Sequence, residues 1–140
     1  MTLRVGLDTF QPIRCSRVED HPIHRERFVV PAETAQTINQ ARSAGGRIIA
    51  VGTTVVRTLE SVAERDGTIR AQSGETSLFI TPGYRFRAID GLISNFHLPR
   101  STLLLLIAAW LGNTKWRTVY SEALQRGFRF YSYGDTMLAW

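Results

Sequence analysis

Apolar residues recur at helical spacing in three segments of the chain, and each segment is followed by residues that commonly end helices. The three segments are Ala32–Arg42, Thr53–Ala63 and Trp116–Leu124. A fourth segment, Leu103–Leu111, is apolar on every side, which predicts a helix that is buried all round. It follows Ser101 and Thr102, whose hydroxyls can cap a helix, and it is well short of the roughly 20 residues of a membrane span. The pattern therefore predicts four helices and no transmembrane segment.

Between these helices the hydrophobic pattern predicts short strands. Arg47–Gly52 is a continuous apolar run, which is typical of a strand buried on both faces. Asp90-Gly91 is a strong signal for a hairpin turn, which would pair Arg85–Ile89 with Leu92–Phe96. The other predicted strands are Leu3–Leu7, Phe28–Val30, Ile69, Leu78–Ile80 and Phe128–Tyr133, with a turn at Ser73-Gly74. Strands that alternate with helices indicate an α/β fold, and we predict a layered α/β/α domain with a mixed sheet.

Three of the predicted strands lead into polar segments. These are Gly52-Thr53-Thr54 with Arg57, then Asn95 to Thr102, and finally Ser132 to Asp135. Ligands of open α/β sheets bind beyond the carboxyl ends of the strands. If the three strands are parallel neighbours, the polar segments meet in one pocket, and we predict the functional site there.

The chemistry of these segments suggests individual roles. His97 and Arg100 lie at the start of a helix, where they can serve as an acid/base group and an anion clamp. The alternative is a structural loop in which the histidine bonds a backbone carbonyl. Gly52-Thr53-Thr54 can hold a phosphate or carboxylate with backbone donors, although it lacks the glycine pattern of a phosphate loop. Asp135 can act as a general base or hold a ribose hydroxyl, and otherwise is a turn residue.

Composition points to an anionic partner. The net charge is +5, and all of the 17 basic residues except Lys115 are arginine, which suits bidentate phosphate recognition. Nucleic acid is the partner that this favours, and the alternative is a genome whose base composition inflates arginine. The single cysteine, Cys15, excludes an internal disulfide and fits the cytoplasm. Cys15, His21 and His24 do not match a known zinc spacing, so we expect no metal.

Several blocks of the sequence occur together in a known family. They are Val5–Pro12, Glu19–His21 with His24, Ala50–Thr54 with Val56–Glu60, Phe79-Ile80 with Pro82–Tyr84, Asp90–Ile93 with Asn95–Leu103, and Tyr133–Asp135 with Met137-Leu138. Together they resemble the C-terminal part of the S-adenosylmethionine:tRNA ribosyltransferase-isomerase family of queuosine biosynthesis. The match runs over essentially the whole chain, and the block from His97 to Thr102 is highly specific.

The resemblance implies a fold and a reaction. It implies an α/β layered domain with an inserted β-barrel, and an enzyme that uses S-adenosylmethionine as a ribosyl donor. The ribose is transferred and isomerised onto 7-aminomethyl-7-deazaguanine at the tRNA wobble position, which gives epoxyqueuosine and releases adenine and methionine. A wobble base in a single-stranded anticodon loop can be splayed into a pocket at modest cost.

With this reaction in view, we predict three groups of site residues. The catalytic residues are His97 and Asp135. The residues that bind S-adenosylmethionine are Gly52, Thr53, Thr54, Arg57, Asn95 and Tyr133. The residues that bind the tRNA anticodon loop are Arg100, Ser101, His21 and His24.

The sequence departs from the family in two places and in length. Asp8 replaces a glycine of the family pattern, and Gly74–Ser77 lacks the usual tryptophan and aspartate. The family is more than twice as long, so we expect residues 1–140 to be the C-terminal portion of the α/β domain, without the barrel. We expect the chain to be inactive alone and to need a separate N-terminal half. The alternatives are a non-catalytic remnant that binds RNA or a partner chain, and a basic α/β domain unrelated in activity.

Overall fold

The computed structural model describes residues 1–6 and 12–140, and within them the strands form two separate three-stranded sheets. The first sheet is antiparallel, with β2 (Glu26–Val30) between β1 (Thr2–Arg4) and β4 (Gln72–Thr76). The side chains of β2 alternate between buried and exposed, so that one face of this sheet contributes to the core. The departure at Asp8 lies outside the described residues.

The second sheet is mixed, with β5 (Gly91–Asn95) in its centre. On one side β5 pairs in parallel with β3 (Ile49–Val51), and on the other it pairs in antiparallel fashion with β6 (Thr136–Ala139). The prediction of an α/β fold with a mixed sheet is therefore confirmed. The single layered sheet is wrong, because the antiparallel strands form a small sheet of their own.

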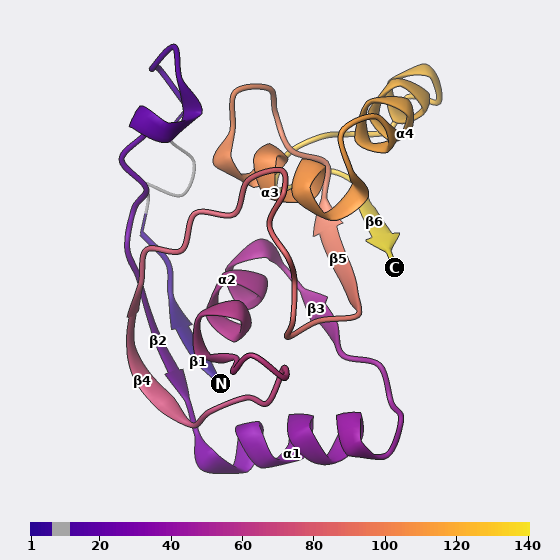
Figure 1. Cartoon of the computed structure of the whole chain (residues 1–140). Helices are drawn as coiled ribbons and strands as arrows, with labels where there is room; N and C mark the ends of the chain where they lie inside the picture. Colours follow the sequence, from indigo (N-terminus) through magenta and orange to yellow (C-terminus); the bar gives the residue numbers. More distant parts are fainter. Residues whose placement is uncertain (7–11) are drawn as a thin grey trace.

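Four helices accompany the sheets, as the hydrophobic pattern predicts. They are α1 (Ala32–Ser43), α2 (Thr53–Val62), α3 (Thr102–Leu111) and α4 (Lys115–Gln125), and one short 3-10 turn, η2, covers Val18–Asp20. Figure 1 shows α2 between the two sheets, with α1 at one end of the molecule and α3 and α4 at the other. None of the helices among the described residues is long and apolar enough to cross a membrane.

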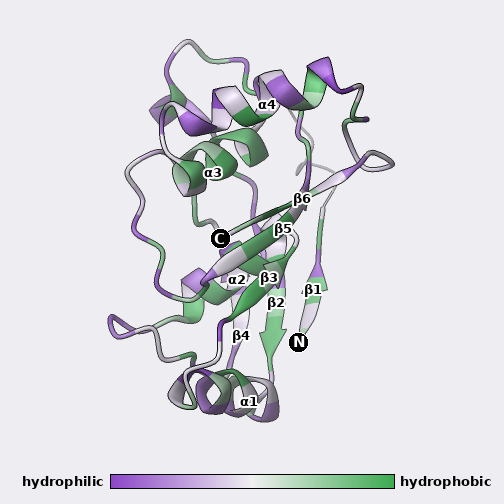
Figure 2. Cartoon of the chain, turned by 90° about the vertical axis from the view of Figure 1, so that its right-hand side faces the viewer, coloured by the Kyte–Doolittle hydropathy of each residue, from purple (hydrophilic) through white to green (hydrophobic). Residues whose placement is uncertain are grey.

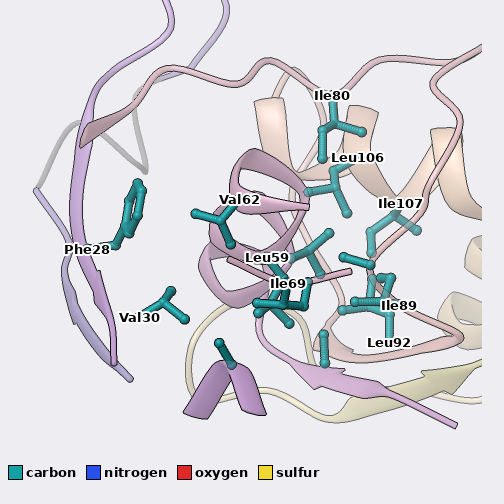
Figure 3. Close-up of a cluster of buried hydrophobic side chains, with 14 of the residues drawn as sticks. Phe28, Val30, Leu59, Val62, Ile69, Ile80, Ile89, Leu92, Leu106 and Ile107 are labelled. Carbon is teal, nitrogen blue, oxygen red and sulfur yellow. The ribbon is translucent and has the colours of Figure 1, made fainter. Parts of the chain in front are cut away.

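The core lies around α2, which joins the two sheets. Phe28 of β2 packs from one side, and Leu92 of β5 packs from the other, with Leu59 of α2 between them (Figure 3). Leu106 and Ile107 of α3 extend the same cluster. A helix placed between two sheets buries apolar side chains around most of its surface, which explains why so many residues of α2 are buried.

Helix α3 is apolar along its length but is not buried all round (Figure 2). Leu103, Leu106, Ile107 and Ala108 are buried, whereas Leu104, Leu105 and Ala109 to Leu111 are only half-buried. Its predicted cap is confirmed, because the Ser101 hydroxyl accepts bonds from the N–H groups of Leu103 and Leu104 at 3.1 and 3.4 Å.

The predicted hairpin at Asp90-Gly91 is wrong. The N–H groups of Arg87 and Ala88 donate to the buried carboxylate of Glu60 on α2, at 2.9–3.1 Å, so they are not available for a strand partner. The Asp90 carboxylate accepts the N–H of Ile48 at 2.8 Å, which ties this segment to the start of β3 instead. β5 consequently pairs with β3 and β6.

The predicted strand Phe128–Tyr133 is also wrong. This segment is irregular, and the rings of Phe128 and Phe130 pack against Phe96 with centroid separations of 5.6 and 5.4 Å. The last strand, β6, follows it. In the same way the predicted turn at Ser73-Gly74 lies inside β4, while Leu78–Ile80 is not a strand.

One face of the mixed sheet is uncovered. Val51 is 64% exposed and Leu138 is 50% exposed, and the register places both beside Ile93 in one row across the sheet. The prediction that β3 is buried on both faces is therefore wrong. A row of exposed aliphatic side chains on a sheet is unusual for a surface that meets only water.

Candidate functional site

The three polar segments predicted from the sequence meet at one edge of the mixed sheet. Gly52–Thr54 follow β3, and Asn95 ends β5; these residues and His97–Ser101 line a cavity of about 560 Å³. Tyr131, Ser132 and Thr136 line the same cavity. Because β6 runs antiparallel to β5, it is the amino end of β6 that lies at this edge. We call this space the sheet-edge cavity.

Apolar side chains form much of the wall of the sheet-edge cavity. Val51 and Ile93 contribute from the uncovered face of the mixed sheet, and Leu3 and Val5 contribute from β1 and the residues after it. The polar groups are thus collected at one side of an apolar hollow, which is the usual character of a small-molecule site.

The first turn of α2 is open toward this cavity. Its N-cap residue is Gly52, whose φ of 96° favours glycine and which has no side chain to accept the free N–H groups. The next residues, Thr53, Thr54 and Val55, all line the cavity. Backbone donors and the positive end of the helix dipole therefore face the cavity, which suits a carboxylate or phosphate.

His97 lies in the same cavity and is held at two points. Its Nε2 atom is 2.8 Å from the hydroxyl of Ser94, and its backbone N–H donates to the Tyr120 hydroxyl at 3.0 Å. Burial lowers the pKa of His97 to about 4, so the imidazole is neutral at pH 7. The ring is therefore unprotonated at neutral pH, and its burial makes it a weaker base than a free imidazole.

The pH dependence of stability tests this burial. The pKa of His97 is about 6.5 in the unfolded chain and about 4 in the folded chain. Between these values the unfolded chain therefore binds a proton on His97 that the folded chain does not bind. The free energy of unfolding should therefore fall as the pH is lowered through this interval, by at most about 3 kcal/mol. Denaturant titrations from pH 8 to pH 4 would measure it. His97→Gln should remove this component, and an identical pH dependence in both proteins would contradict the buried neutral ring.

Two residues with unusual backbone conformations line the cavity. Arg100 has a φ of 57° and Tyr131 a φ of 73°, and they are the non-glycine residues with positive φ in the described part of the chain. Each is pinned by a backbone bond, from Ile13 N–H to Arg100 O at 2.7 Å and from Tyr131 N–H to Phe96 O at 2.9 Å. Backbone strain that the surrounding fold enforces is common at functional sites.

Arg57 lies beneath the cavity rather than in it. Its side chain is 4% exposed, with Nη1 2.8 Å from Glu26 Oε2 and 2.8 Å from His24 Nε2. Thr54 donates to Glu26 at 3.1 Å, so the buried network reaches the cavity wall through Thr54. Burial lowers the pKa of Arg57, and the charge of Glu26 opposes that shift. Arg57 and His24, predicted as ligand contacts, thus hold the start of α2 against β2.

Breaking this pair should be costly. Arg57→Met leaves the Glu26 carboxylate buried without its cation, and we expect a loss of about 3–5 kcal/mol in the free energy of unfolding. The matched control is Arg27→Met, because Arg27 pairs with Glu75 at 2.8 Å on the surface. That change should cost far less, because water screens an exposed ion pair. Equal losses in chemical denaturation would show that the buried pair is not a structural anchor.

Asn95 lines the cavity, whereas Tyr133 and Asp135 do not, although they lie between the lining residues Ser132 and Thr136 in the chain. Asn95 donates to the carbonyls of Gly134 and Asp135, both at 3.4 Å. The Asp135 carboxylate accepts the N–H of Arg129 at 2.7 Å, and this bond is the main reason that its pKa lies below the usual value. Tyr133 is 96% exposed, so its ring is free to meet a ligand.

His21, the remaining predicted residue, does not line the sheet-edge cavity. His21 packs against Phe79, with ring centroids 5.9 Å apart, and borders a shallow groove formed with Pro12, Arg14, Cys15 and Pro22. Within the described residues, no group of three or more histidine, cysteine, aspartate or glutamate side chains is placed to hold a metal ion.

Sequence reasoning missed Glu26, Ser94 and Tyr131. Glu26 shares the buried face of β2 with Phe28 and Val30, and an acidic residue at a core position was the available signal. Ser94 is likewise buried in β5 beneath His97. For Tyr131 the sequence carries no signal, because its place depends on how the irregular segment before β6 folds.

The chain matches the family model described as queuosine biosynthesis protein over residues 1–139. It is 58% identical over 137 residues to the S-adenosylmethionine:tRNA ribosyltransferase-isomerase of Geobacter sulfurreducens, a match that covers 98% of this chain and 40% of the relative. The enzyme of the same name from Moorella thermoacetica is 56% identical over 136 residues, with 97% and 40% covered. The chain therefore spans about 40% of the length of these curated relatives.

A solved structure has the same fold. The crystal structure of S-adenosylmethionine tRNA ribosyltransferase from Thermotoga maritima aligns with a TM-score of 0.72 and 46% sequence identity. The alignment covers 81% of this chain and 40% of the Thermotoga chain.

Proposed function

The chain belongs to the family of queuosine biosynthesis proteins, and on that premise we propose that it forms the C-terminal part of an S-adenosylmethionine:tRNA ribosyltransferase-isomerase. The proposed reaction moves the ribosyl group of S-adenosylmethionine onto 7-aminomethyl-7-deazaguanine at the tRNA wobble position and isomerises it to epoxyqueuosine. Adenine and methionine are released. The names of the curated relatives and the fold shared with the Thermotoga enzyme support this reaction.

The observation that carries the proposal is the sheet-edge cavity, which takes the donor. The open first turn of α2, at Gly52 to Thr54, receives the carboxylate of S-adenosylmethionine. Asn95 lines the same cavity and offers an amide, and the exposed ring of Tyr133, next in the chain to the lining residue Ser132, can stack on the adenine or on the cationic sulfonium. Arg57 does not contact the donor. It pairs with Glu26, which accepts a hydrogen bond from Thr54, and so holds the start of α2 in place.

Proton transfer in this cavity belongs to His97. The reaction requires a base to remove a proton from the carbon beside the sulfonium, and His97 is the unprotonated imidazole that lines the cavity. Ser94 fixes the ring through Nε2. Asp135, which directly precedes the lining residue Thr136, has a lowered pKa and can accept a hydrogen bond from a ribose hydroxyl.

The RNA lies across the outer surface of the site. Arg100 is exposed beside Ser101 at the start of α3, and His21 borders the neighbouring groove with Arg14. We assign the anticodon-loop contacts to Arg100, Ser101 and His21. The His24 side chain is 7% exposed and contacts Arg57. We therefore assign it a structural role rather than a direct contact with RNA.

Binding of an anticodon stem-loop should weaken steeply with salt. Each arginine–phosphate contact releases counterions, and on single-stranded RNA it adds a slope of about 0.7 to the plot of log affinity against log salt. Fluorescence anisotropy between about 50 and 200 mM salt would measure the slope. Arg100→Gln should reduce it by about one contact. The exposed Arg65, beyond the far end of α2, supplies a control change to Gln that leaves the slope unaltered. An affinity independent of salt would contradict the RNA surface.

The uncovered face of the mixed sheet supports the proposal that this chain needs further polypeptide for activity. Val51 and Leu138 are exposed on that face, and Val51 also lines the cavity. We propose that residues 1–140 are the C-terminal portion of the α/β domain, and that a separate N-terminal half covers this face and closes the cavity. We place the reaction in the cytoplasm.

A further inference from the structure

A second cavity, of about 540 Å³, adjoins the sheet-edge cavity. The two cavities share Arg100 and Ser101, so the start of α3 is the wall between them. The backbone bond from Ile13 N–H to Arg100 O, at 2.7 Å, fixes the outer wall of the second cavity to this partition. We call it the α3–α4 cavity.

The walls of the α3–α4 cavity are apolar. Leu104, Leu105 and Ala108 come from α3, and Trp116 comes from α4. The indole of Trp116 is held by its neighbours, because Tyr120 packs edge-on at a centroid distance of 5.9 Å and the Arg117 guanidinium lies 4.8 Å from the ring centroid. An indole beside leucine side chains favours a flat, apolar ligand group.

The charge at this cavity has one sign. Its charged lining residues are Arg14 and Arg100, both exposed, and no carboxylate is among the described residues that line it. Two guanidinium groups around an apolar hollow attract a ligand that joins a flat ring to phosphates, and they repel the cationic sulfonium of the donor. That combination describes a nucleotide whose base is unstacked from its strand.

We propose that the α3–α4 cavity binds the unpaired acceptor base of the RNA substrate, with the flanking phosphates on Arg14 and Arg100. This inference rests on the proposed function, and it adds the position of the second substrate. The donor occupies the sheet-edge cavity, and the acceptor base lies on the other side of Arg100 and Ser101. Two substrates that exchange a group must meet, and the partition at the start of α3 is where they do.

Cys15 gives a direct probe of this cavity, because it is the single cysteine of the chain and lines the cavity wall. The rate of its alkylation by iodoacetamide would be measured alone, with S-adenosylmethionine, and with an anticodon stem-loop that carries 7-aminomethyl-7-deazaguanine. The same stem-loop with an abasic wobble position is the comparison ligand. At a stem-loop concentration of ten times Kd, occupancy of the cavity slows alkylation about tenfold. The donor and the abasic stem-loop leave the rate nearly unchanged.

A surface substitution supplies an independent measurement. Ser16 is exposed and lines the mouth of the cavity, so Ser16→Trp fills it without disturbing the core. Ser43→Trp is the control, since Ser43 is exposed at the end of α1. Loss of one stacked base weakens binding about tenfold or more in the first variant and leaves the second unchanged.

The outcomes separate this inference from the proposed function. If the stem-loop binds but Cys15 reacts at its free rate, or if the abasic stem-loop protects it equally, the acceptor base lies elsewhere and the proposed function stands. If Ser16→Trp binds the stem-loop as well as Ser43→Trp, the inference is also overturned. If neither stem-loop binds at low salt, the proposed function and this inference fail together.

Discussion

Replacing His97 by glutamine is expected to lower the turnover of the complete enzyme by about 10²–10⁴-fold while leaving it folded. His97 is the proposed base, and its ring is unprotonated at neutral pH, with Nε2 2.8 Å from the Ser94 hydroxyl. Glutamine keeps a polar group near Ser94 but cannot take up a proton. Adenine release in single-turnover conditions is the measurement, since it follows the chemical step rather than product release.

Arg100 provides the companion test of the same loop. Arg100→Gln removes the cation between the two cavities, and we expect a higher KM for the tRNA together with a lower kcat. Thermal unfolding of both variants serves as the control for folding. Unchanged turnover in both variants, with intact folding, would remove the loop from Asn95 to Ser101 from the mechanism.

The helices could be predicted from the sequence because their signals are local. The spacing of apolar residues, together with the helix-ending residues after them, predicts the bounds of α1, α2 and α4 to within one or two residues. The Ser101 cap predicts where α3 begins. Each of these signals is contained within about four residues of the helix that it predicts, so it needs no knowledge of distant contacts.

The strand pairing could not be predicted, because distant residues decide it. Asp90-Gly91 is a strong turn signal, yet the carboxylate of Glu60 takes the N–H groups of Arg87 and Ala88 and prevents the hairpin. A carboxylate 27 residues earlier in the sequence is invisible to any local pattern. The same holds for Phe128 and Phe130, which pack on Phe96 rather than extend as a strand.

The meeting of the three polar segments at one cavity was nevertheless predicted, for a partly different reason. Three parallel strands were expected to bring the loops together, whereas the predicted strand Phe128–Tyr133 is irregular and the antiparallel β6 that follows it reaches this edge with its amino end. The loops that contain Thr53, His97 and Ser132 therefore still line one cavity. What the sequence could not predict is the buried support beneath it, where Glu26 and Arg57 join elements that are far apart in the chain.

The uncovered face of the mixed sheet bears on how much of the site this chain holds. Val51, Ile93 and Leu138 form an aliphatic row on that face, and Val51 and Ile93 also line the sheet-edge cavity. The chain spans about 40% of the relatives' length, so these relatives have further polypeptide that can cover the row. A donor that needs enclosure on all sides would remain partly in water without it.

We propose that this chain supplies the donor cavity of a transferase-isomerase and becomes active only when the uncovered face of the mixed sheet is covered. The most direct measurement is adenine release from S-adenosylmethionine in the presence of substrate tRNA. It would be made with the purified chain alone and with a separately expressed N-terminal half. His97→Gln in the mixture is the matched control, because it leaves the covered face unchanged. We predict release in the mixture, none from the chain alone, and a rate about 10²–10⁴-fold lower with the control variant. Release by the chain alone would contradict the dependence on a second half, and no release in the mixture with both parts folded would identify a non-catalytic remnant.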